Sequence, residues 1–149
     1  MLSLKQSNRV QDRDEFPRPE TWHLHRVSYG ETDAMGVVYY ANYLHWFEMA
    51  RNTYIRELGI SYVEIEEKGI FIPVTSASCR YFKPARFDDP VYIRAGISTW
   101  GRASFAFEYQ VYDQERKFLL ARGETGHACL SRQGRPVRVP DWLKQICRG

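Results

Sequence analysis

The sequence predicts an α+β domain in which one five-stranded antiparallel sheet wraps around a single long helix. Aromatic residues are abundant, with 4 Trp, 10 Tyr and 8 Phe among 149 residues, and bulky rings favour the half-buried surface of a sheet. Apolar and polar residues alternate over 91–98 and 104–111, as they do in strands with one buried face. Over 42–58 the bulky residues instead recur every three or four positions, which is typical of an amphipathic helix.

The elements are expected in the order strand, long helix, short helical turn and four further strands. Asn42 is placed to cap the long helix, and Gly59 follows its end. Ser61 and Glu64 have the spacing of a capping box for the short turn over 61–68. Residues 1–20 offer little to bury and are expected to form a flexible leader, which leaves 21–149 as one domain. The expected strands are 21–29, 70–82, 91–98, 105–111 and 118–131.

Charge, cysteine and histidine patterns exclude several classes of protein. The 21 Lys and Arg are interspersed with 18 Asp and Glu, so we expect no nucleic-acid partner. No apolar run approaches the ~20 residues of a membrane span, and the N-terminus lacks the apolar block of a signal peptide. The 3 Cys form no Cys-x-x-Cys pair, and the 4 His show no metal spacing. These features predict a cytoplasmic protein without a metal site.

A single helix covers only one face of a five-stranded sheet. The other face must therefore be polar or be covered by a neighbouring subunit. We expect a homo-oligomer, either a homodimer or a homotetramer.

The loop ahead of the long helix is the most unusual segment, because Gly30 and Gly36 flank the carboxylate of Asp33 there. Asp is a favoured turn residue, so Asp33 could simply accept hydrogen bonds from loop amides. Alternatively, it could be a reactive carboxylate near a helix N-terminus. The chain has no Gly-x-Ser-x-Gly elbow, Walker loop or Gly-x-Gly-x-x-Gly motif, which excludes those enzyme classes.

The run TDAMGVVYYANY over 32–43, followed by WFE over 46–48, resembles the signature of hot-dog-fold acyl-CoA thioesterases of the 4-hydroxybenzoyl-CoA thioesterase type. The segments FDDP (87–90), RASF (102–105) and GRPVRVP (134–140) extend the resemblance over 21–143. The resemblance implies a hot-dog fold, which is a curved antiparallel sheet around one long helix. That arrangement agrees with the one predicted from periodicity.

The resemblance implies that Asp33 is the catalytic carboxylate, acting either as a nucleophile or as a general base on water. It also implies that the backbone N–H of Tyr40 is an oxyanion donor and that Gly36 lets the backbone approach the thioester. By the same likeness we expect substrate contacts from Asn42, Tyr43, Trp46, Arg102 and Ser104. No cofactor is implied.

Two positions depart from the family pattern. Many relatives carry His where this chain has Tyr40, although the benzoyl-type branch has Tyr. The basic cluster that holds the coenzyme A phosphates is reduced here to Arg102, so we expect Arg102 to contact those phosphates. Lys83 or Arg86 could take over this role, or the acyl group could arrive on the phosphopantetheine arm of an acyl carrier protein.

Other chemistry-bearing residues have simpler interpretations. Glu48 could be the acid of another hot-dog branch, but its spacing suits an ion pair with Arg51. His25 and His127 are expected to pack or hydrogen-bond within the sheet. Trp46 suits the core as well as an acyl pocket.

Taken together, these features predict an acyl-CoA thioesterase that releases a carboxylic acid and free coenzyme A. One alternative is hydrolysis of acyl groups from an acyl carrier protein. The other is a non-catalytic acyl-binding module with the same fold, against which the presence of Asp33 and Gly36 argues.

Overall fold

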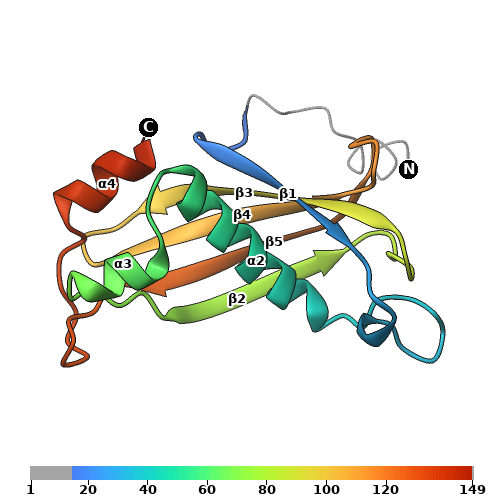
Figure 1. Ribbon diagram of the computed structural model, residues 1–149, viewed down its shortest axis with the longest axis horizontal. Coiled ribbons are helices and arrows are strands. Elements are labelled where there is room, and N and C mark those ends of the chain that lie inside the picture. Colours follow the sequence, from blue (N-terminus) through green and yellow to red (C-terminus); the bar gives the residue numbers. More distant parts are fainter. Residues whose placement is uncertain (1–14, 149) are drawn as a thin grey trace.

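The computed structural model describes residues 15–148, which form one antiparallel sheet with a long helix across it (Figure 1). The strands lie in the spatial order β1-β3-β4-β5-β2, so β1 and β2 are the two edges. This arrangement confirms the predicted fold class. The strands are β1 (Glu20–Arg26), β2 (Val74–Tyr81), β3 (Pro90–Trp100), β4 (Ser104–Tyr112) and β5 (Leu119–Ala128).

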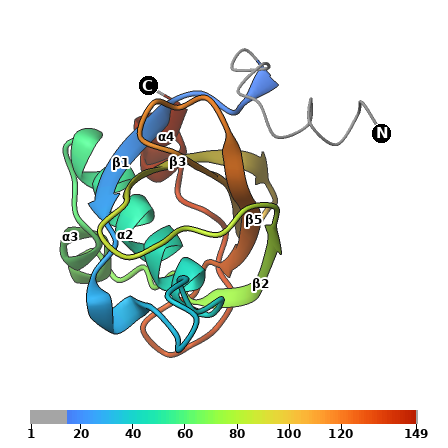
Figure 2. The same ribbon diagram turned by 90° about the vertical axis from the view of Figure 1, so that its right-hand side faces the viewer.

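The long helix, α2 (Asn42–Glu57), lies on the concave face of the sheet, which curves around it in Figure 2. Phe47 stacks on Tyr109 of β4, with ring centroids 4.2 Å apart. Gly123 of β5 lies directly beneath the Phe47 ring, where the Cβ of any other residue would clash with it. The buried face of α2 matches the predicted spacing and consists of Tyr43, Trp46, Phe47, Ala50, Tyr54 and Ile55.

The ends of the helices differ from the prediction in two respects. Ala41, not Asn42, occupies the N-cap position of α2, because the Asn42 side chain donates to the carbonyl of Glu31 at 2.8 Å instead of capping the helix. The short helix α3 (Tyr62–Glu67) follows the prediction, with the hydroxyl of Ser61 accepting from the Glu64 amide at 3.2 Å.

A C-terminal helix, α4 (Asp141–Arg148), was not predicted from the sequence. Its buried residues are Leu143 and Cys147, one turn apart. The hydroxyl of Tyr54 in α2 donates to the carbonyl of Cys147 at 3.3 Å, which ties α4 to the end of α2. Within 15–148, no helix combines the length and hydropathy that a membrane span requires.

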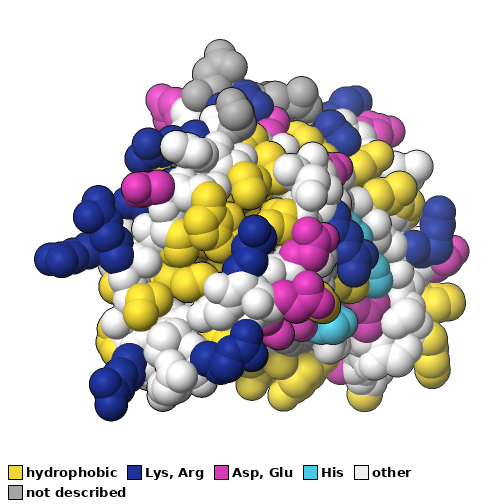
Figure 3. Space-filling view, turned by 60° about the vertical axis from the view of Figure 1, so that its left-hand side comes forward, with side chains coloured by type: hydrophobic (Ala, Val, Ile, Leu, Met, Phe, Trp, Pro, Cys, Tyr) yellow, Lys and Arg dark blue, Asp and Glu magenta, His cyan; other side chains and the backbone are white. Residues whose placement is uncertain are grey.

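The convex face of the sheet is largely polar. Arg94, Gln110 and Arg122 occupy one row across β3, β4 and β5, and Glu108 lies opposite Glu124 in the next row. On the side of the molecule shown in Figure 3, basic, acidic and apolar side chains also lie close together. The face that α2 does not cover was expected to be either polar or covered by a neighbouring subunit. Much of the convex face is polar.

The N-terminal segment contributes to the same face. Residues 1–14 of the expected leader lie outside the described residues, whereas Phe16 is only 4% exposed. Its ring lies 4.0 Å from the guanidinium carbon of Arg94, and the backbone approaches Gly96 so closely that a Cβ there would clash. The packed domain therefore includes residues on the N-terminal side of the predicted boundary at 21.

Candidate active site

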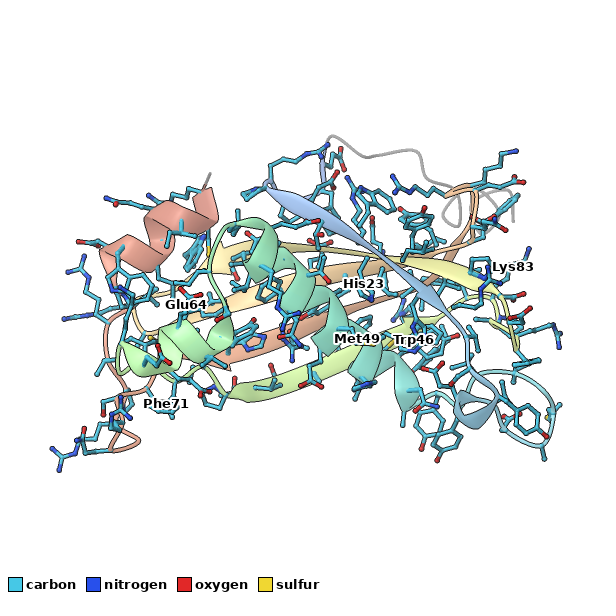
Figure 4. The ribbon with its side chains drawn as sticks, viewed as in Figure 1. His23, Trp46, Met49, Glu64, Phe71 and Lys83 are labelled. Carbon is cyan, nitrogen blue, oxygen red and sulfur yellow. The ribbon has the colours of Figure 1, made fainter. Side chains whose placement is uncertain are left out.

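A cavity of about 410 Å³ opens at the N-terminal end of α2. The loop ahead of α2 and the segment after β2 form its walls, and a hydrogen bond of 2.9 Å from the Val38 amide to the Ala85 carbonyl joins the two. Figure 4 shows Lys83 at this end of the molecule. The lining residues are Asp33, Val37, Val38, Tyr39, Tyr40, Tyr43, Tyr81, Phe82, Lys83 and Pro84.

The loop geometry holds the Asp33 carboxylate by one oxygen. Its Oδ1 accepts from the amide of Met35 at 2.8 Å and from that of Val37 at 3.4 Å. Among the described residues no hydrogen bond engages Oδ2. The turn closes through Gly36, whose φ of +77° is readily adopted only by glycine. Asp33 therefore satisfies the loop amides through Oδ1, and the residue also lines the cavity.

Glu31 anchors the base of this loop. It ends the 3-10 turn η2 (Tyr29–Glu31) that follows β1, and its carboxylate accepts from the indole of Trp46 at 2.6 Å and the amide of Ser28 at 2.7 Å. The imidazole of His25 lies 2.9 Å away. Burial raises the pKa of Glu31. The hydrogen bonds from Trp46, Ser28 and His25 lower it by more than burial raises it, so the pKa of Glu31 lies below its ordinary value. An ionised Glu31 therefore connects β1, η2 and α2.

Tyr40 presents its backbone to the same cavity. In the part of the chain that the structure describes, its amide has no hydrogen-bond acceptor. Its carbonyl accepts from the hydroxyl of Tyr81 at 2.8 Å, and its side chain is 60% exposed. Because α2 begins two residues later, the unpaired N–H lies at the positive end of the helix dipole.

Aromatic rings form much of the remaining wall. The ring centroids of Tyr39 and Tyr40 are 4.6 Å apart, and Tyr81 meets Tyr43 edge-on at 5.0 Å. Burial raises the pKa of Tyr43, which keeps its hydroxyl protonated at neutral pH. The cation at the cavity is Lys83, whose ammonium also lies 4.9 Å from the Phe118 ring centroid.

Not all predicted site residues meet at this cavity. Asp33, Tyr40 and Tyr43 line it, with Gly36 in the same loop. Trp46 is fully buried beneath it and uses its N–H to bind Glu31, so it contributes to the core in this chain. Asn42 is held by the Glu31 carbonyl.

Arg102 and Ser104 lie elsewhere. They belong to the hairpin between β3 and β4, which is at the opposite end of the sheet from the Asp33 loop (Figure 1). The carbonyl of Arg102 accepts from the Val139 amide at 2.8 Å, so the hairpin packs against the C-terminal segment. Within one chain, Arg102 and Ser104 do not reach the Asp33 cavity.

The predicted ion pair between Glu48 and Arg51 is wrong. Glu48 pairs with His45 at 3.3 Å on the surface of α2, and Arg51 instead donates to the hydroxyl of Tyr109 at 3.0 Å. The two strand histidines behave as predicted, since His25 meets Glu31 and His127 lies 2.8 Å from the Thr125 hydroxyl. Among residues 15–148, no group of three potential metal ligands comes together.

Sequence patterns did not identify several lining residues, above all Tyr81 and Phe82. They come from the end of β2, some forty residues beyond Tyr40, and reach the cavity only because β2 is the sheet edge beside the start of α2. Nothing in the local spacing of β2 distinguishes a ring that lines a cavity from one that faces solvent. The sequence suggests Lys83 only as a replacement phosphate contact.

Comparison with known proteins identifies the family to which the chain belongs. Residues 27–146 match the thioesterase-like superfamily, and the chain belongs to that family. It is 32% identical over 121 residues to the acyl-CoA thioesterase YbgC of Haemophilus influenzae, covering 80% of this chain and 88% of YbgC.

Other relatives are named for particular substrates. The 1,4-dihydroxy-2-naphthoyl-CoA hydrolase of Thermosynechococcus vestitus is 30% identical over 134 residues, which are 86% of this chain and 91% of that protein. The structure of the DHNA-CoA thioesterase from Staphylococcus aureus superposes with a TM-score of 0.77 at 32% identity, covering 84% of this chain and 87% of that one. These neighbours share the hot-dog fold predicted from the sequence.

Proposed function

We propose that this protein is an acyl-CoA thioesterase with Asp33 as its catalytic carboxylate. The observation that carries the proposal is the presence of the Asp33 carboxylate and the unpaired Tyr40 amide on one cavity, at the N-terminus of α2. A carboxylate that can act as nucleophile or base, together with a preorganised N–H donor for the oxyanion, is sufficient for thioester hydrolysis. Membership of the thioesterase-like superfamily supports the same reaction.

Two routes use this geometry. In the first, an Asp33 oxygen attacks the thioester carbon, the C–S bond breaks, and the thiolate leaves and is protonated. Water then hydrolyses the resulting mixed anhydride.

In the second route, Asp33 takes a proton from water as that water attacks the carbonyl, and the proton passes to the departing sulfur. In both, the Tyr40 N–H stabilises the negative charge that develops on the carbonyl oxygen. The anchored Oδ1 leaves Oδ2 as the reacting oxygen.

The aromatic wall favours an aromatic acyl group. Rings of Tyr39, Tyr40, Tyr43, Tyr81 and Phe82 line the cavity, and flat rings stack well on such surfaces. Two relatives are named for a bicyclic aromatic acyl-CoA, which supports the same preference. Benzoyl-CoA should therefore be hydrolysed with a higher kcat/KM than hexanoyl-CoA.

The binding of coenzyme A is proposed to use Lys83 from the same chain and Arg102 from a partner chain. Lys83 stands at the cavity, whereas Arg102 lies at the far end of the sheet and could reach a cavity only across an interface. A homodimer could form through β2, because this edge strand is exposed along almost its whole length. The dimer would pair the two β2 edges.

Thiol release from a panel of acyl-CoAs tests the proposed activity. Turnover of acyl-CoA supports the enzyme, whereas turnover confined to acylated carrier protein would support the alternative substrate. Binding of acyl-CoA without any thiol release would identify a non-catalytic module. An acyl-pantetheine without the nucleotide shows how much the phosphates contribute, because it lacks the groups that Lys83 and Arg102 would contact.

A further inference from the structure

A second hollow, of about 230 Å³, lies between α2 and α3, away from the residues that line the Asp33 cavity. Its polar lining includes Arg51 and Asn52 of α2 and Tyr62 of α3. Its apolar lining consists of Ile65, Ile70 and Ile72.

The cation of this pocket has only neutral partners. Arg51 is half-buried, and its Nη1 donates to the Tyr109 hydroxyl at 3.0 Å. That hydroxyl lies 2.6 Å from Thr125 Oγ1, which in turn lies 2.8 Å from His127 Nε2, so the network continues through uncharged groups. Among residues 15–148, Arg51 forms no ion pair with Asp or Glu. A guanidinium withdrawn from water without a counter-ion is unfavourable, and an anion would relieve this cost.

Tyr62 provides a second unsatisfied group. Its hydroxyl is buried and makes no hydrogen bond to any described residue. Buried hydroxyls almost always have a partner, so an orphan at the wall of a hollow indicates a missing ligand. Burial raises the pKa of Tyr62, while the nearby Arg51 lowers it through its charge and through its N–H groups, which approach the hydroxyl without reaching hydrogen-bond geometry. The Arg51 guanidinium and the Tyr62 hydroxyl therefore lie close together.

We propose that this pocket binds the carboxylate of a small organic acid. The carboxylate would accept charge-assisted hydrogen bonds from Arg51 and one hydrogen bond from the Tyr62 hydroxyl, while the Asn52 amide offers a further donor. The three isoleucines would cover the apolar part of the acid.

The charges at the rim favour a monoanion over a phosphate. Glu48 and Glu66 also line the hollow, and both are exposed. Glu48 already pairs with His45. These two carboxylates oppose the entry of any anion and oppose a phosphate dianion more strongly than a monoanion, so the pocket suits a single negative charge with an apolar body. The proposal concerns binding and does not depend on the thioesterase assignment.

Calorimetry with the full chain tests the site, using butyrate, its neutral isostere butyramide and inorganic phosphate as probes. We expect butyrate to bind and the other two to bind at least ~10-fold more weakly, because only butyrate combines one charge with an apolar body. Arg51→Gln should weaken butyrate binding by at least ~10-fold. Arg56→Gln, an exposed arginine on the same helix, should leave it unchanged.

Tyr62→Phe keeps the ring and removes only the orphan hydroxyl. It should weaken butyrate binding several-fold with little change in the stability of the protein, since the hydroxyl has no protein partner in hydrogen-bond geometry. Asp33→Asn should bind butyrate as the wild type does, which separates this pocket from the Asp33 cavity. Undetectable binding of butyrate to the wild type would overturn the proposal. So would equal butyrate affinities in the wild type, Arg51→Gln and Tyr62→Phe, or equal affinities for butyrate and butyramide.

Discussion

The indole N–H of Trp46 donates to the carboxylate of Glu31 over 2.6 Å, joining the buried face of α2 to the turn that precedes Asp33. The Glu31 carbonyl also accepts from the Asn42 side chain and from the Tyr39 amide, at 2.8 and 2.9 Å. One residue thus fixes both ends of the loop that carries Asp33. The position of Asp33, the proposed catalytic carboxylate, is therefore expected to depend on this second acid, which lies two residues earlier.

Glu31→Ala should reduce kcat by ~10- to 100-fold with a smaller change in KM, because the Asp33 loop loses its anchor while the cavity wall remains. The variant should also lose ~1–3 kcal/mol of stability, since the Trp46 and His25 side chains lose their partner. Steady-state kinetics and urea unfolding measure both effects. Glu67→Ala, an exposed acid on α3, is the matched control. A Glu31→Ala enzyme with wild-type kcat would show that the loop holds its geometry without this anchor.

Tyr40→Phe should reduce turnover by less than ~10-fold, because the proposed oxyanion donor is the backbone N–H and not the phenol. Tyr40→Pro removes the donor, and the loss of one such donor costs ~10² to 10³ in turnover. The proline variant is informative only if its melting temperature and oligomeric state match the wild type. A severe loss in a folded Tyr40→Phe variant would contradict the backbone-donor model.

Light scattering at micromolar concentration should show at least a dimer, twice the 17.6 kDa of one chain. Val74→Lys combined with Ala77→Lys places charges along the exposed edge of β2 and should shift the protein toward monomer. Val63→Lys, on the exposed surface of α3, should leave the oligomeric state unchanged. A wild-type protein that is monomeric and fully active would exclude the shared-site arrangement.

Stability should depend on pH through His127, which is 3% exposed. Burial, followed by the charge of Arg51, lowers the pKa of His127 to about 4, from 6.5 for an unperturbed histidine. Between these values the unfolded chain binds a proton that the folded chain does not, so the free energy of unfolding falls as pH falls from about 6.5 to 4. The contribution is about 2–3 kcal/mol.

Urea unfolding at pH 7.5 and 4.5 measures this effect. His127→Gln should reduce the stability difference between the two pH values by that amount, whereas the exposed His45→Gln should not change it. If the two variants show the same pH dependence, His127 is not the group responsible.

The sequence alone predicts the parts of the fold that depend on local periodicity. The spacing of Tyr43, Phe47 and Tyr54 identifies α2, and alternation identifies β3 and β4. The capping role predicted for Asn42 is wrong, because its side chain donates to the carbonyl of Glu31, eleven residues earlier in the chain. A local pattern does not contain this contact. The α4 helix was missed since it is only eight residues long, although Leu143 and Cys147 have helical spacing.

The site shows the same division. Asp33, Gly36 and Tyr40 fall within one run of eight residues, so a motif captures them together. Tyr81 and Arg51 are placed instead by contacts between distant segments. The Tyr81 hydroxyl donates to the Tyr40 carbonyl, and Arg51 donates to the Tyr109 hydroxyl. Such contacts depend on strand order and side-chain direction, which a local pattern does not contain.

The most direct test of the account is the turnover of benzoyl-CoA by Asp33→Asn, measured by thiol release beside the wild type. Asn keeps the size of the side chain and an oxygen that can accept from the Met35 amide, but it can neither attack the thioester nor accept a proton. We predict a loss of ~10² to 10⁴ in kcat, with an unchanged melting temperature and oligomeric state. Near-normal turnover by a folded Asp33→Asn protein would contradict the assignment of Asp33 as the catalytic carboxylate.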